Sequence, residues 1–247
     1  ERPHVRAAAA EALAAVPSMQ SFELLLPLLE RADTRRSARR ALLALGDEAL
    51  ERLARELANE GASRRLRRHL PRSISRFESP RALEILQQHL PAERDGAVRY
   101  KCLRGMGRIV QEHPEYPLDR TLIHESIRNH LQRIYRFDEW QLRITQGAAE
   151  RPELRSSEAH ELLVVALEEK RRNALERVFR CLQMLRPDES FELYWRALDE
   201  RTSTLRAASR ELVEHAVPPA YRETLLAMID DGGLVTRVER AALSLER

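Results

Sequence analysis

The sequence has little lysine, cysteine, glycine or aromatic residue, and each shortage excludes a class of protein. Of its 247 residues, 8 are glycine, 2 are cysteine and 5% are aromatic. The cysteines, Cys102 and Cys181, cannot build the disulfide framework of a small secreted domain, and their place on apolar helical stripes suits a reducing cytosol. Runs in which Val, Ile or Thr alternate with polar residues are absent, so we expect no β-sheet.

Long apolar segments are also missing. No uninterrupted apolar stretch approaches the roughly 20 residues that a membrane span needs, and we recognise no signal peptide. We therefore expect no transmembrane segment in this chain. Because it starts at Glu1 inside a helical pattern, we take it as a fragment of something longer.

The basic residues are nearly all arginine. The only lysines are Lys101 and Lys170, among 42 lysines and arginines. A GC-rich bacterial genome would produce this bias without selection, so arginine content alone is weak evidence for a nucleic-acid partner. The distribution of charge is more informative, because residues 1–110 hold 21 basic and 14 acidic residues, a net +7, whereas the remainder has 21 and 25, a net −4.

The sequence is rich in helix-forming residues and shows helical periodicity. Ala, Leu, Arg and Glu dominate, and apolar residues recur at the spacing of one helix face. Gly, Pro, Ser and Asp mark short turns between these segments. We predict helices over residues 3–16, 19–32, 34–45, 47–60, 63–77, 80–90, 95–112, 118–146, 156–185, 189–201, 203–216, 220–230 and 235–246.

Paired helices joined by short turns are typical of an α-solenoid. The predicted fold is all-α, a single right-handed α-solenoid over residues 1–247. It has regular repeats in 1–112, longer irregular helices in 118–185 and further repeats in 188–247. Segment 118–146 reads as one helix or as two joined near residues 137–139. Residues 147–153 read as a loop, and Pro27 and Pro71 should each bend a helix.

Several second helices open with an aliphatic residue followed by arginine, at Arg6, Arg67, Arg99 and Arg206. In this spacing they resemble HEAT repeats. The family's arginine usually pairs with an acidic turn residue, so the resemblance implies that Asp95 is the partner of Arg99. The repeat at 33–45 departs from the pattern, because Arg35 stands where the aliphatic residue is expected.

Residues 66–76, 167–182 and 205–212 are similar to the soluble HEAT region of bacterial fusion proteins. In these, an ATP/ADP-translocase-like membrane module precedes HEAT repeats, sometimes with a cyclic-nucleotide-binding domain. The resemblance implies a cytoplasmic domain, tethered to the inner membrane through an N-terminal module that this chain does not contain. It transfers no catalytic residue.

The sharpest local feature is a row of basic residues on two second helices. On a helical wheel, Arg65, Arg68, Arg72 and Arg76 cluster opposite an apolar stripe. In the next repeat the equivalent face carries Lys101, Arg104 and Arg108. Because second helices line the concave side of a HEAT solenoid, these rows could stack into one basic groove for an anionic ligand.

Three alternatives to this groove stay open. The rows could be a solvated face neutralised by neighbouring carboxylates such as Glu84. The chain could be a passive spacer between membrane and sensor domains. It could also be a nucleic-acid-binding module resembling the HEAT-like alkylpurine DNA glycosylases, although Tyr100 is the only Tyr or Trp in residues 1–110 and such binding needs aromatic platforms.

We find no catalytic motif. His124-Glu125 and His160-Glu161 begin like the HExxH zinc motif but lack its second histidine, and neither cysteine has a neighbouring ligand. We therefore expect no metal, no cofactor and no enzymatic activity. The predicted function is an interaction or regulatory scaffold that binds an acidic protein segment, or other domains of the same polypeptide, by charge. The sequence leaves its oligomeric state open.

Overall fold

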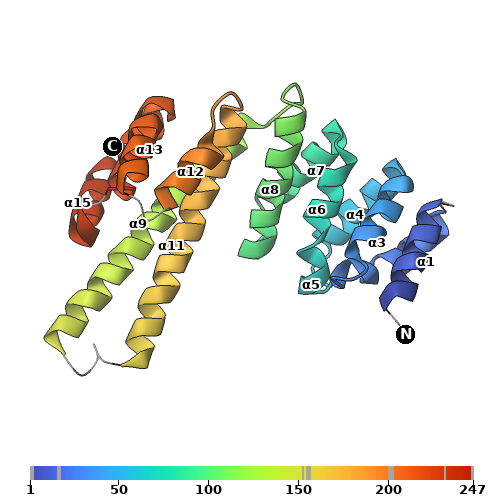
Figure 1. Cartoon of the computed structure of the whole chain (residues 1–247), viewed down its shortest axis with the longest axis horizontal. Helices are drawn as coiled ribbons and strands as arrows, with labels where there is room; N and C mark the ends of the chain where they lie inside the picture. Colours follow the sequence, from blue (N-terminus) through green and yellow to red (C-terminus); the bar gives the residue numbers. More distant parts are fainter. Residues whose placement is uncertain are drawn as a thin grey trace. The chain divides into compact units, whose positions relative to one another are not determined.

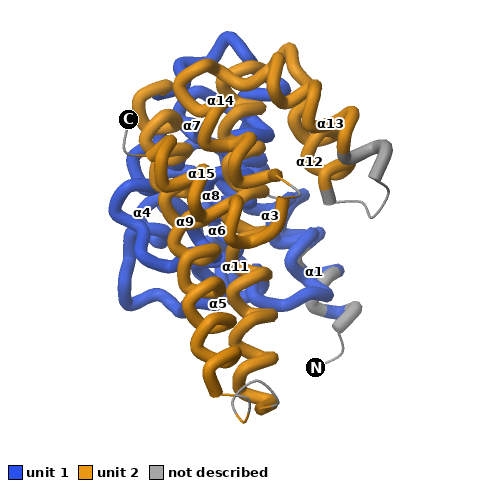
Figure 2. Tube along the Cα trace, turned by 90° about the vertical axis from the view of Figure 1, so that its left-hand side faces the viewer, with its two compact units in different colours: residues 1–119 blue, residues 120–247 orange. Residues whose placement is uncertain are grey.

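The structure is a computed structural model that describes residues 3–15, 18–151, 153, 157–199, 203–230 and 232–245. Over these ranges the chain is helical without a β-strand, which confirms the all-α prediction. It divides into two compact units, residues 1–119 and 120–247, coloured separately in Figure 2. Each unit is described by itself, so the single continuous solenoid and its handedness stay predictions.

Unit 1 is a row of short helices that follow one another along the chain (Figure 1). Its α-helices are α1 (Pro3–Ala15), α2 (Phe22–Leu25), α3 (Arg35–Ala44), α4 (Asp47–Ala58), α5 (Arg64–Arg67), α6 (Leu70–Ile74), α7 (Pro80–His89) and α8 (Gly96–Glu112). Three 3-10 turns complete it: η1 (Met19–Ser21), η2 (Pro27–Glu30) and η3 (Ser75–Phe77).

The helices of unit 1 form two layers. Helices α1, α3, α6 and α8 are the second helices of successive pairs, and each contacts the next. In the other layer α4 contacts α7, and within pairs α4 packs on α6 and α7 on α8. The second helices of unit 1 therefore lie side by side.

Apolar stripes explain why these segments fold together. Leu42, Leu53, Leu70, Leu86 and Met106 come from the five helices α3, α4, α6, α7 and α8 and are fully buried. The helix starts match the expected capping chemistry: Ser79 accepts a hydrogen bond from the N–H of Ala82, with Pro80 at the first helical position.

Two predicted helices are broken in the structure. Segment 19–32 is divided into η1, α2 and η2, and the 3-10 turn starts at Pro27. Segment 63–77 is divided into α5, α6 and η3, and Pro71 lies in the first turn of α6 rather than bending a continuous helix. Proline lacks the N–H for the preceding turn, which explains why both breaks fall at or just before it.

Unit 2 is built on a long antiparallel hairpin, α9 (Arg120–Glu150) and α11 (Glu158–Leu185) (Figure 1). It continues with α12 (Phe191–Asp199), α13 (Ser203–Ala216), α14 (Pro219–Met228) and α15 (Gly233–Leu245). The last two pack against α9. Helix α9 is therefore one continuous helix through residues 137–139. The loop predicted over residues 147–153 is wrong at its start, because α9 continues to Glu150.

Trp140, on α9, is 48% exposed and packs edge-on against Phe137. Trp195, on α12, is half-buried against Phe179. In the part of the chain that the structure describes, no helix combines the length and the apolar character that crossing a bilayer requires.

Candidate functional site

The predicted basic residues differ in their exposure to solvent and in whether their charged groups have a partner. Arg65, Arg68, Arg72, Arg76 and Arg104 are exposed, whereas Lys101 and Arg108 are half-buried. Four of the exposed guanidinium groups make no hydrogen bond or ion pair with any described residue: Arg68, Arg72, Arg76 and Arg104. Those four are the open positive charges of the predicted row.

The other three predicted residues are engaged. Arg108 donates to the carbonyl oxygen of Ser75 and to a carboxylate oxygen of Glu78, both at 2.6 Å. This holds η3 against α8 and neutralises the charge, so Arg108 does not contribute an open cation to a groove. The Nε of Arg65 donates to the Glu30 carbonyl at 3.0 Å, and the ammonium of Lys101 lies 5.5 Å from the centre of the Tyr100 ring.

Four arginines that sequence reasoning missed lie beside this row on α3. A pocket of about 580 Å³ between α3 and the α6–η3 segment is lined by Ala32, Arg35, Arg36, Arg39, Arg40, Leu43, Arg72 and Arg76. We call these eight residues the arginine pocket. It contains six arginines and no carboxylate. The sequence feature that could have revealed this pocket is the group of arginines within residues 35–40, in which Arg35 departs from the repeat pattern.

Two arginines of the pocket are fixed by neutral groups. Arg35 donates to the carbonyl oxygens of Leu29 at 2.6 Å and Glu30 at 2.9 Å. The Nε of Arg39 donates to the Ser73 hydroxyl at 3.2 Å. These bonds orient both guanidinium groups but leave their charges unneutralised.

The electrostatics of the arginine pocket reflect this excess of positive charge. Burial lowers the pKa of Arg39 to about 10, with further contributions from Arg72, Arg35 and Arg76. His69 lies next to the same cluster. Its pKa is lowered to about 4 by burial and by the charges of Arg35, Arg39, Lys101 and Arg68.

The nearby carboxylates Glu84 and Glu11 neutralise at most one arginine of the pocket. Glu84, which could have neutralised the row, pairs with Arg81 at 2.8 Å on its own helix. Glu11 reaches the edge of the arginine pocket and pairs with Arg40 at 2.6 Å. The remaining five arginines of the pocket form no ion pair with a described residue.

Two arginines that resemble the HEAT arginine contact Glu93, whereas the resemblance implied Asp95 as the partner of Arg99. Arg67 donates to the buried carboxylate of Glu93 at 2.6 Å, and Arg99 donates to the Glu93 carbonyl at 3.1 Å. Asp95 caps α8 through the N–H groups of Ala97 and Val98, and it pairs with Arg64. The side chains of Arg6 and Arg206 lie outside the described part of the chain.

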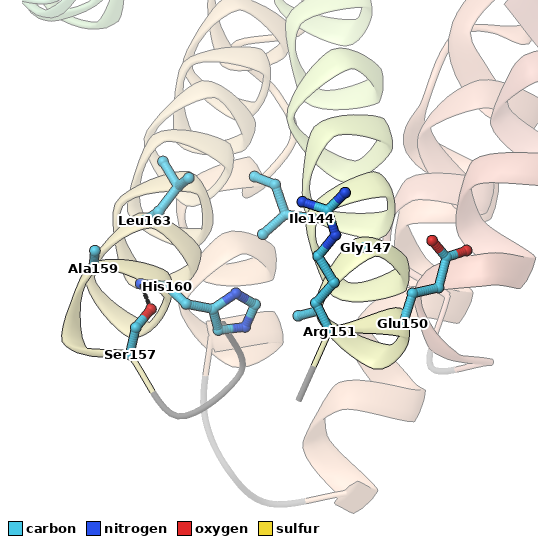
Figure 3. A pocket seen from close by; sticks show the side chains of 9 residues that line it. Ile144, Gly147, Glu150, Arg151, Ser157, Ala159, His160 and Leu163 are labelled. Atoms are coloured by element: carbon cyan, nitrogen blue, oxygen red, sulfur yellow. Dashed lines mark hydrogen bonds between the residues drawn. The ribbon is translucent and has the colours of Figure 1, made fainter. Parts of the chain in front are cut away.

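A second hollow, of about 460 Å³, lies where α9 ends and α11 begins (Figure 3). The ring of His160 extends from α11 into it, near Arg151. The Ser157 hydroxyl accepts a hydrogen bond from the N–H of His160 at 3.2 Å, which is the role of a helix cap.

Unit 2 also has a larger pocket, of about 660 Å³, with both signs of charge. Arg171 and Arg237 at this pocket point to the buried carboxylate of Asp138, at 2.7 and 3.6 Å. Two guanidinium groups of this network therefore share one carboxylate. No group of three or more His, Cys, Asp or Glu side chains suited to a metal ion occurs within the described ranges.

Comparison with known proteins adds one finding. Residues 5–31 match the family model described as PBS lyase HEAT-like repeat. A search of the curated proteins finds no match to this chain. The matched segment runs from α1 to η2. The match and the stacked helix pairs together support a HEAT-repeat protein with an α-solenoid fold.

Proposed function

We propose that the chain is a non-enzymatic protein-interaction scaffold. Its exposed arginines in unit 1, Arg68, Arg72, Arg76 and Arg104, would capture an acidic segment of a partner protein or of the same polypeptide. The observation that carries the proposal is the set of exposed arginines on the α5–η3 segment and on α8 that have no carboxylate partner among the described residues. HEAT-like repeats commonly serve as interaction scaffolds.

The physical reason is that uncompensated arginines on one face repel one another. An acidic segment lying along the face would neutralise that repulsion and would gain charge-assisted hydrogen bonds. Such binding should weaken steeply with salt, because the screening length is about 10 Å at 0.1 M ionic strength.

The cellular context is also a proposal. The resemblance of residues 66–76, 167–182 and 205–212 to the HEAT region of translocase-like fusion proteins supports a cytoplasmic domain of a membrane-transporter-like protein, held at the inner membrane by another module. The natural acidic partner would then be a neighbouring domain of the same polypeptide.

A binding titration tests the scaffold function. We expect a fluorescein-labelled polyglutamate peptide to bind the whole chain at low salt and to be released as salt rises. Substitutions R68E and R104E should abolish binding. The control is R55E with R94E, which changes the net charge equally on exposed arginines of α4 and of the loop before α8.

Two results would contradict the proposal. If R68E with R104E binds the peptide as well as the control does, the face is a solvated surface or a passive spacer. If duplex or single-stranded DNA shifts in a gel at moderate salt while the peptide does not bind, the chain is a nucleic-acid-binding module.

A further inference from the structure

The arginine pocket differs from the rest of the basic face because it is recessed and carries one sign of charge. Six arginines from α3, α6 and η3 surround a space of about 580 Å³ without a carboxylate. The apolar lining is limited to Ala32 and Leu43. A recess of this kind selects its ligand by charge and oxygen geometry rather than by apolar contact.

The pocket combines fixed and free guanidinium groups. Arg35 and Arg39 are held by carbonyl and hydroxyl oxygens, and Arg40 is held by Glu11. Arg36, Arg72 and Arg76 are exposed and have no hydrogen bond or ion pair with a described residue. The fixed groups preorganise the site, and the free groups can close on a ligand from three elements, α3, α6 and η3.

The number of converging guanidinium groups indicates the ligand. A carboxylate or a phosphodiester has one negative charge and two free oxygens, which one or two arginine forks satisfy. A phosphomonoester has three terminal oxygens and a charge of about −1.5 to −2 at neutral pH. It therefore matches five unneutralised arginines better than an acidic side chain or a nucleic-acid backbone does.

We propose that the arginine pocket binds a phosphomonoester on a protein segment, that is, a phosphorylated side chain. This rests on the proposed function, because the exposed Arg68 and Arg104 would hold the flanking acidic residues of the same segment. A protein segment is favoured over a membrane surface, because Leu43 is the only exposed large apolar side chain in the pocket and the site is recessed.

Small anions test the pocket chemistry without a choice of peptide sequence. Inorganic phosphate added to the whole chain above its second pKa should shift the NMR signals of the Arg39 and Arg72 side chains. Acetate at equal ionic strength should leave these signals unchanged. Equal responses to the two anions would overturn the proposal.

A peptide series tests the partner. Three labelled peptides share one acidic sequence and carry phosphoserine, glutamate or serine at the centre. The phosphoserine peptide should bind at least about 10-fold more tightly than the glutamate peptide, since it adds charge-assisted hydrogen bonds. Replacing Arg72 and Arg76 by glutamine should remove this preference, whereas R55Q with R94Q should keep it.

The outcomes separate the two proposals. If the phosphoserine and glutamate peptides bind equally, the scaffold function stands and the phosphomonoester site is overturned. If none of the peptides binds, both proposals fail. If vesicles with phosphomonoester headgroups bind through Arg72 and Arg76 while the phosphopeptide does not, a protein partner is overturned.

Discussion

The guanidinium of Arg67 donates to the buried carboxylate of Glu93 at 2.6 Å, which joins α5 to the loop that precedes α8. The Glu93 side chain is 1% exposed and also contacts the ring nitrogen of His89 at 2.8 Å and the N–H of Asp95 at 2.7 Å. This single carboxylate therefore links two successive helix pairs of unit 1. The resemblance to HEAT repeats had led us to expect Asp95 as the acidic partner, and for Arg99 rather than for Arg67.

Replacing Glu93 by glutamine should destabilise unit 1 strongly. The neutral amide keeps the size of the side chain but leaves the charge of Arg67 without its partner, a change that typically costs about 3 kcal/mol for a buried pair. Urea denaturation followed by circular dichroism measures the loss. Glu51→Gln is the matched control, because the Arg81–Glu51 pair is about half exposed and should contribute less than about 1 kcal/mol. Equal effects of the two substitutions would show that Glu93 does not link the repeats.

The stability of the chain should fall in acid partly through Glu93. Burial raises the pKa of this carboxyl, but the Asp95 N–H, His89 and Arg67 together lower it more, so its pKa lies below the usual 4.5. A group with a lowered folded pKa stabilises the protein above its unfolded pKa and loses that contribution as pH falls. Unfolding free energies measured from neutral pH to about pH 3 should therefore decrease below about pH 4.5, and less steeply in Glu93→Gln. Identical slopes would exclude Glu93 as the cause.

Asp95 should matter as a helix cap more than as an ion-pair partner. Its carboxylate accepts hydrogen bonds from the N–H groups of Ala97 at 2.7 Å and Val98 at 3.2 Å, whereas its partner Arg64 is largely exposed. Asp95→Ala should lower the unfolding free energy by about 1 kcal/mol, and Asp95→Asn, which retains a capping oxygen, by much less. Thermal and urea unfolding of both variants make the comparison. An asparagine variant as unstable as the alanine variant would assign the effect to the ion pair.

Alanine should have opposite effects at two helical glycines. A Cβ at Gly105 would lie 3.2 Å from the Pro71 carbonyl oxygen and 3.0 Å from a Leu86 methyl, whereas a Cβ at Gly147 meets open space. Gly147→Ala should stabilise the chain by roughly 0.5–1 kcal/mol, because alanine has a higher helix propensity and loses less backbone entropy on folding than glycine. Gly105→Ala should instead destabilise it by roughly 1 kcal/mol, because overpacking exceeds that gain. Stabilisation of both variants in denaturant melts would contradict close packing of α8 on α6.

The sequence was sufficient for the parts of this protein that depend on neighbours along the chain. Apolar residues at helical spacing predict most of the helices to within a few residues, and the Ser79-Pro80 start of α7 follows from capping chemistry. Pro27 and Pro71 were expected to bend their helices, but each helix is instead broken there, because proline disfavours the preceding turn and the 3-10 alternative depends on tertiary packing.

The tertiary structure decided which charges are open and which are neutralised. Arg39 and Arg76 come from different repeats and line the same pocket because α3 packs beside α6. Arg104 and Arg108 belong to the same predicted basic row, but only Arg108 is paired with Glu78, because α8 packs against η3. The spacing of residues along a helix determines the face on which each side chain lies, and the helix that packs against that face determines whether its charge meets a carboxylate, a carbonyl or solvent.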